Sequence, residues 1–297
     1  MFLAPETLQL TIDKKRQLFG FLRDAPLKSL THYPLPIINY RMTYCLGIIT
    51  ESGIIMASDS RTNAGVDNIS TYLKLFDFSS LGERAILICT SGNLSITQAV
   101  INCLEKDIKI PEEQNLYSLP NMHEIARYIG GKIREVLERD RPWLQQDGIS
   151  VTCSFILGGQ IKGQEHELYL IYKQGNFIRA TKETPFLQIG EIKYGKPILD
   201  RTIRYDSTSL QDAAKCALVS IDSTMKSNIS VGPPIHLVLY EKDSLNTQKR
   251  LKLRLGDPYL AKIRQVWEES LKNAFNGIPD IDWQYNSDES PEDIMID

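Results

Sequence analysis

The chain has 297 residues, a mass of 33.8 kDa and a formal net charge of −3 at pH 7. Its hydrophobic fraction of 42% and charged fraction of 24% are ordinary for a globular protein that buries one large core. The slightly acidic balance excludes the basic surface of a typical nucleic-acid-binding protein, and no apolar run approaches the roughly 20 residues that cross a bilayer.

The cysteines and histidines show no pattern of a metal site or a disulfide framework. No CxxC pair occurs, the cysteine number is odd, and the histidines lack ligand spacing. We therefore expect reduced core cysteines, no metal, no cofactor and a cytoplasmic location. These residues are Cys45, Cys89, Cys103, Cys153 and Cys216, with His32, His123, His166 and His236.

Residues 1–42 mix charged residues with short apolar pieces and lack the plan of a secretory signal. They are interpreted as a propeptide, as the product of a misassigned start, or as an arm that stays attached. The second interpretation is favoured, because Met42 followed by the small Thr43 is a start whose methionine is normally trimmed. The attached arm would place the Thr43 amine in a peptide bond.

A β-hairpin is predicted from Thr43 to Ser58. Residues 43–50 and 54–58 are β-branched or apolar, and Glu51-Ser52-Gly53 forms the turn between them. The hairpin brings Asp59 beside Thr43, although sixteen residues separate them in the chain. Fifteen residues further on, Lys74 lies in the stretch 71–76, where apolar residues flank it.

Thr43, Asp59 and Lys74 are a coherent set for nucleophilic catalysis. A threonine hydroxyl needs a base, and a free α-amine on the same residue, with a pKa of about 8, supplies one. A lysine ammonium lowers the pKa of both groups, and an aspartate orients the lysine. The spacing alone is weak evidence, because such a trio is common in any hairpin.

The next strand is predicted at Ala85–Thr90, and a helix at Leu94–Lys106 follows Ser91-Gly92-Asn93. Gly92 has two interpretations: it merely permits the turn, or it leaves an N–H at the positive end of the helix dipole to stabilise an oxyanion.

Further elements alternate in groups of strands and helices. After a linker at 116–120 and a helix at 121–139, a meander is expected at 151–158, 167–172 and 177–181. A strand at 186–190, helices at about 195–205 and 209–228, and a strand at 235–241 complete one compact domain, residues 43–245. This order predicts an α+β fold with two sheets stacked between helical layers.

Residues 246–297 form a C-terminal extension. An exposed strand is expected at 250–255, followed by an extra helix, Tyr259–Phe275, whose apolar face needs a partner. We expect that partner to be a neighbouring subunit. Residues 280–297 are acidic and are expected to be partly disordered, with Ile281, Trp283 and Tyr285 as candidate anchors.

Several stretches of the chain together carry a resemblance: Met42-Thr43-Tyr44-Cys45, 57–70, Ser91-Gly92-Asn93, 186–191, 193–200 and 227–234. Through them the chain resembles the Anbu family, bacterial proteasome-like proteins related to proteasome β-subunits and to the HslV peptidase. The resemblance runs from Met42 to about residue 275 and implies the four-layer αββα sandwich of N-terminal-nucleophile hydrolases. It also implies a threonine peptidase that hydrolyses peptides or unfolded proteins inside a homo-oligomer, either a ring or an open spiral, with an unidentified ATP-dependent unfoldase as partner.

The resemblance assigns roles to individual residues. Thr43 matches the nucleophile, Asp59 and Lys74 its acidic and basic partners, and Gly92 the oxyanion-hole glycine. Two departures occur: β-subunits place a serine near the position of Glu191, and an aspartate with a serine in the stretch 227–230. Here Ser227 and Ser230 are present and the carboxylate is missing, so Glu191, Ser227 and Ser230 are assigned supporting roles.

Three functions remain open. The first is the threonine peptidase; the second is a silent or weakly active assembly subunit; the third is an amidohydrolase of the same fold that acts on a small amide. Cys45 is a rival nucleophile, but its position inside the strand favours a core or pocket-wall role.

Overall fold

The computed structural model describes residues 43–63, 69–110, 112–147, 149, 151–281 and 283. The predictions for residues 1–42, and for the acidic segment apart from 280, 281 and 283, lie outside these residues. All of the described residues belong to one compact unit, Arg41–Asp297.

Two five-stranded antiparallel sheets form the centre of this unit. One has the order β10-β1-β2-β11-β12 and the other β5-β6-β7-β8-β9, while β3 and β4 form a separate ribbon. The strands are β1 (Tyr44–Thr50), β2 (Gly53–Ser58), β3 (Arg61–Asn63), β4 (Ile69–Thr71), β5 (Leu75–Asp77), β6 (Arg84–Gly92), β7 (Cys153–Ile161), β8 (Glu167–Ile171), β9 (Phe177–Arg179), β10 (Phe186–Gly190), β11 (Ile235–Glu241) and β12 (Arg250–Leu253).

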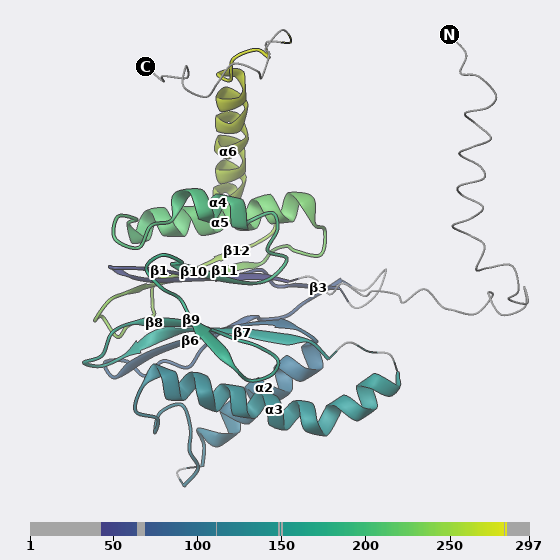
Figure 1. The fold of residues 1–297 in the computed structure, drawn as a ribbon, viewed down its shortest axis with the longest axis vertical. Helices are drawn as coiled ribbons and strands as arrows, with labels where there is room; N and C mark the ends of the chain where they lie inside the picture. The colour runs from purple at the N-terminus through teal and green to yellow at the C-terminus, as the bar shows by residue number, and fades with distance from the viewer. Residues whose placement is uncertain are drawn as a thin grey trace, which may run out of the picture. The chain divides into compact units, whose positions relative to one another are not determined.

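Helices cover the outer face of each sheet, which gives the expected αββα order of layers (Figure 1). The α4 and α5 helices lie on the β1 sheet, and α2 and α3 lie on the β6 sheet. An ion pair of 2.7 Å between Asp107 of α2 and Lys132 of α3 joins the second pair of helices. The helices are α2 (Leu94–Asp107), α3 (Met122–Gln146), α4 (Lys196–Thr202), α5 (Leu210–Ser227) and α6 (Pro258–Asn276).

The sequence of β1 explains why both of its faces are buried. Tyr44, Leu46 and Ile48 pack with the core under α4 and α5, whereas Cys45 and Ile49 pack between the two sheets. Because side chains alternate along a strand, Thr43 falls on the side of Cys45, toward the opposite sheet. A strand enclosed on both faces is apolar throughout, as the sequence of β1 shows.

Most predicted elements are confirmed. The β1–β2 hairpin, the β7-β8-β9 meander and the exact ends of the strands at 186–190 and 235–241 agree with the structure. One expectation was wrong in detail: α3 continues through Pro142 to Gln146. The linker at 116–120 does lie between α2 and α3, and it also buries Leu116 and Leu119 in the core.

The extra C-terminal helix, α6, extends away from the α4–α5 layer (Figure 1). Leu260 is its one buried side chain, while Leu271 is 50% exposed and Phe275 is 74% exposed. Of the candidate anchors of the acidic segment, Ile281 and Trp283 are 70% and 87% exposed in the single chain, and Tyr285 lies outside the described residues. The outer part of the apolar face of α6 is therefore uncovered in the single chain, whereas Ile263 packs against the core under α4 and α5.

Candidate active site

Thr43 precedes β1 and is held in place by the residues around it. Its side chain is buried, with 6% exposed. The next residue, Tyr44, points into the opposite core, where its hydroxyl hydrogen-bonds with Ser220 Oγ at 2.6 Å and accepts a hydrogen bond from Gln188. These contacts fix the beginning of β1, and with it the position of Thr43.

Asp59 lies directly beside the peptide that follows Thr43. The Tyr44 N–H donates to Asp59 Oδ1 at 3.1 Å, and the Asp59 N–H donates to the Tyr44 carbonyl at 3.1 Å. This pairing continues the hairpin register, in which Cys45 lies opposite Ser58. The expected proximity of Asp59 to the start of β1 is thus confirmed.

Lys74 reaches the same point from the turn before β5. Its Nζ donates to Asp59 Oδ1 at 2.8 Å and to the Arg61 carbonyl at 2.5 Å. The Lys74 carbonyl accepts the Thr90 N–H at 2.9 Å, so β6 of the other sheet positions the lysine. The two sheets therefore meet in one ion pair beside Thr43.

This ion pair is almost completely removed from solvent. Asp59 is 0% and Lys74 4% exposed. Burial raises the pKa of the Asp59 carboxyl, while Lys74 and the N–H groups of Tyr44 and Gly232 act to lower it. The carboxylate has a donor on each oxygen, since Oδ2 accepts the Gly232 and Arg61 N–H groups, each at 3.2 Å.

The carbonyl of Thr43 is held by the β10 edge. The Glu191 N–H donates to it at 2.7 Å. Gly190, opposite Tyr44, has φ +89°, and a Cβ there would lie 1.8 Å from the Thr43 carbonyl oxygen. Only glycine allows this approach.

Glu191 connects the site to the loop after α5. Its side chain is buried and accepts a hydrogen bond from Asn228 Nδ2 at 3.2 Å. Asn228 Oδ1 in turn accepts the Ser230 N–H at 2.9 Å. Sequence reasoning missed Asn228 and identified its neighbours Ser227 and Ser230, yet Ser227 is exposed at the end of α5 and Ser230 joins the chain of contacts through its main chain.

Gly92 ends β6, where the chain enters α2. It has φ +110°, and a Cβ would lie 2.3 Å from the Thr152 carbonyl oxygen. Asn93 caps the helix, since its Oδ1 accepts the Ser95 N–H at 3.0 Å. The glycine thus lies at a helix N-terminus as the sequence predicted, and its proposed role with an oxyanion stays a prediction.

Cys45 lies in the layer between the sheets with no exposed surface, and its thiol is 3.6 Å from the Thr90 carbonyl. Burial raises the pKa of this thiol well above its ordinary value, which keeps it protonated and a poor nucleophile. The core role expected for Cys45 agrees with this environment.

Among the described residues, no group of three or more His, Cys, Asp or Glu side chains is arranged to hold a metal ion. Within the same residues, no helix combines the length and the apolar character needed to span a membrane.

Comparison with known proteins identifies the family to which this fold belongs. The proteasome subunit family matches residues 41–239. No curated protein matches the chain significantly.

Three solved structures are similar to the chain over nearly their whole length. Anbu (ancestral beta-subunit) from Yersinia bercovieri is 45% identical, with 81% of this chain and 100% of that chain covered and a TM-score of 0.76. The Anbu complex of Pseudomonas aeruginosa, solved as a helical assembly, is 44% identical, with 82% and 100% covered and a TM-score of 0.78. Anbu from Hyphomicrobium sp. strain MC1 is 43% identical, with 81% and 100% covered and a TM-score of 0.73.

The family is shown by both kinds of similarity. The matched segment of the family includes Thr43, Asp59, Lys74 and Gly92, and the solved relatives share the αββα architecture at more than 40% identity. This chain therefore belongs to the Anbu family of proteasome-like proteins.

Proposed function

We propose that the chain is a threonine peptidase of the proteasome type, in which Thr43 becomes the N-terminal residue and the nucleophile. The observation that carries the proposal is the buried Asp59–Lys74 ion pair at 2.8 Å beside the start of β1. Apolar residues fill such a position at least as stably as an ion pair does. A chemical use for the charges accounts for their presence better than stability does.

The reaction follows from these groups. The free α-amine of Thr43 takes the hydroxyl proton as Oγ attacks the substrate carbonyl, and the Lys74 ammonium favours the deprotonated hydroxyl. The Gly92 N–H stabilises the oxyanion. The amine then gives its proton to the leaving peptide, which leaves an ester on Thr43, and a water molecule hydrolyses this ester to restore the enzyme.

Glu191 and Asn228 supply the supporting layer in this proposal. Asn228 holds the Glu191 side chain at 3.2 Å, and the Glu191 N–H holds the Thr43 carbonyl at 2.7 Å. This connection replaces the carboxylate that β-subunits carry near residues 227–230. Ser230 completes this connection through its main-chain N–H, which donates to Asn228 Oδ1. In this proposal Ser227 acts only at the end of α5, next to Asn228.

The proposed working form is a homo-oligomer in the cytoplasm. A relative at 44% identity is solved as a helical assembly, and α6 exposes Leu271 and Phe275 here. We assign α6 to the subunit interface, where burial of these side chains stabilises the contact. Peptides or unfolded proteins are the proposed substrates, and an ATP-dependent unfoldase is the proposed partner.

A silent assembly subunit is the second candidate. The missing carboxylate in the stretch 227–230 favours it, whereas the exposed side chains of α6 serve assembly equally well in both candidates. A small-amide hydrolase remains the third alternative and is separated from the peptidase by its substrates.

The test begins with the intact mass and N-terminal sequence of the protein made from its own gene. We expect a chain that begins at Thr43 and that reacts once per subunit with an electrophile requiring both a hydroxyl and a free amine. Thr43→Ser should keep this reaction and Thr43→Ala should lose it. Turnover of unfolded protein supports the peptidase, and turnover of small amides alone supports the amidohydrolase. An assembled chain whose Thr43 stays in a peptide bond would show the silent subunit instead.

A further inference from the structure

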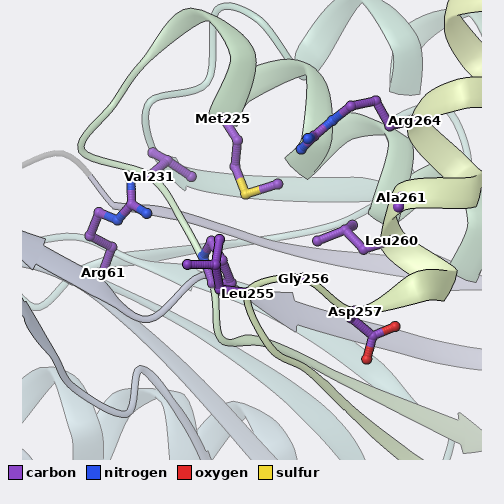
Figure 2. Close-up of a pocket in the computed structure, with 10 residues that line it drawn as sticks. Arg61, Met225, Val231, Leu255, Gly256, Asp257, Leu260, Ala261 and Arg264 are labelled. Carbon is purple, nitrogen blue, oxygen red and sulfur yellow. The ribbon is translucent and has the colours of Figure 1, made fainter.

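A pocket of about 230 Å³ lies at the base of α6, between this helix, the end of α5 and the loop that enters β11 (Figure 2). A water molecule occupies about 30 Å³ in the liquid, so the pocket has room for one or two side chains. Its floor is apolar and two arginines reach into it. The lining residues are Arg61, Met225, Val231, Pro233, Leu255, Gly256, Asp257, Leu260, Ala261 and Arg264.

The two guanidinium groups make this pocket attractive to carboxylates. The Arg61 guanidinium donates to the Ile229 carbonyl at 2.7 Å, and none of the ion pairs among the described residues includes Arg61. Arg264 Nη2 and Nε donate to Asp222 Oδ1 at 2.6 and 2.9 Å, which leaves Nη1 and an exposed face of the group. Guanidinium groups bind carboxylates through paired N–H donors.

Asp222, outside the lining, already forms an ion pair with Arg264, and the single carboxylate in the lining does not pair with Arg61. Asp257 caps α6, with its Oδ1 accepting the Tyr259 N–H at 2.9 Å. Figure 2 shows the Asp257 carboxylate pointing away from both guanidinium groups. The helix N-terminus beside it adds a partial positive charge.

We propose that this pocket binds the acidic C-terminal segment of the same chain, residues 286–297. The segment carries five carboxylate side chains and no basic residue, and it contains the aliphatic run Ile294-Met295-Ile296. The carboxylates match Arg61 and Arg264, and one aliphatic side chain fills the apolar floor.

The chain is long enough for this contact. α6 has 19 residues and rises about 28 Å at 1.5 Å per residue. Ile294 lies eighteen positions after Asn276, a stretch that spans up to about 60 Å at 3.3 Å per position. The segment can therefore return along α6 to the pocket at its base.

The pocket shares one residue with the active site. The Arg61 carbonyl accepts Lys74 Nζ, and the Arg61 N–H donates to Asp59, while the side chain lines the pocket. A carboxylate bound to that side chain therefore fixes the residue that holds the catalytic pair. The binding itself does not depend on the proposed peptidase function.

The experiment measures binding rather than activity. The chain is shortened after Tyr285, which removes only residues outside the described ones, and a labelled peptide of residues 286–297 with an amidated C-terminus is added. We expect saturable binding by fluorescence anisotropy that weakens as salt rises, because screening reduces the attraction between charges.

Leu255→Asp is the variant that tests the location. Leu255 is 83% exposed at the mouth of the pocket, so the change repels the peptide without opening the core. We expect affinity to fall about tenfold or more, since like charges at an interface are repelled. Leu81→Asp is the matched control, because Leu81 is a 70% exposed turn leucine on the other sheet.

Hydrogen exchange on the full chain tests whether the segment binds its own subunit. We expect residues 254–264 to exchange more slowly in the full chain than in the shortened one, at all protein concentrations. A difference in protection between the full and the shortened chain that grows with concentration would place the segment on a second copy and overturn the proposal. Absence of binding, or equal binding by the two aspartate variants, would overturn it as well.

Discussion

Replacing Lys74 with methionine should destabilise the protein more than replacing both members of the ion pair. Lys74→Met keeps the approximate volume but leaves the Asp59 carboxylate, which is 0% exposed, without its cation. Breaking a buried pair on one side costs about 3–5 kcal/mol. We expect about 3 kcal/mol, because three N–H groups still donate to Asp59. Asp59→Asn with Lys74→Met removes both charges and should cost about 1–2 kcal/mol.

The destabilisation caused by Lys74→Met should depend on pH, and the pKa of Asp59 determines whether it grows or shrinks as pH rises. Burial already raises the pKa of Asp59 above its ordinary value, and loss of Lys74 removes a group that lowers it. A carboxyl with a raised pKa in the folded state favours folding below its unfolded pKa of about 3.9 and loses that advantage as pH rises through the folded pKa. The penalty of Lys74→Met should therefore grow between pH 4 and pH 8, whereas that of the double variant should stay constant.

Urea unfolding followed by far-ultraviolet circular dichroism measures these differences, with protein concentration held fixed because assembly contributes to stability. Both variants should lose the reaction of Thr43. The double variant should therefore regain part of the free energy of unfolding while it stays unreactive. Equal penalties for the single and double variants at every pH would refute the reasoning, because the buried carboxylate would then need no cation.

Three further predictions concern other contacts. Gly190→Ala should cost more than about 2 kcal/mol in urea unfolding, because a Cβ would lie 1.8 Å from the Thr43 carbonyl oxygen, whereas Gly82→Ala, with φ +77° and open space, should cost about 1 kcal/mol. Burial acts to raise the pKa of Asp107, but hydrogen bonds from its lysine and tyrosine partners on α3 lower it overall. The corresponding stability is present above about pH 4 and is lost as pH falls, so Asp107→Asn should cost about 1–2 kcal/mol at pH 7 and progressively less in unfolding experiments below pH 4. Phe275→Glu should lower the mass of the assembly in sedimentation. Leu81→Glu, at a leucine of similar exposure in the β5–β6 turn, should leave that mass unchanged.

The parts of the site that the sequence predicted are those set by local register. The hairpin places Asp59 against the peptide after Thr43, because six residues of β1 pair with β2 in one continuous ladder. Polar residues at the end of such a hairpin are neighbours whatever the rest of the chain does. Lys74 was correctly grouped with them, although its position depends on the Thr90 N–H in the other sheet.

The contacts that sequence reasoning missed join distant and unremarkable residues. Glu191 and Asn228 are 37 positions apart, and one asparagine at the end of a helix looks like an ordinary cap. The three-residue strands β3, β4 and β5 were also missed, because alternation over three residues is too short to recognise. Leu116 and Leu119 lie in a polar, proline-containing stretch, so only their packing against the helices shows that they belong to the core.

Arg61 shows how one residue can serve two neighbouring sites through different atoms. Its main chain binds Asp59 and Lys74, and its side chain packs so closely on Gly232 that a Cβ there would lie 2.4 Å from the Arg61 Cζ. A substitution of Arg61 would disturb the ion pair and the pocket together, and its effect on either would be uninterpretable. Leu255 lines the same pocket without any contact to the pair, so a change there separates occupancy of the pocket from the chemistry at Thr43.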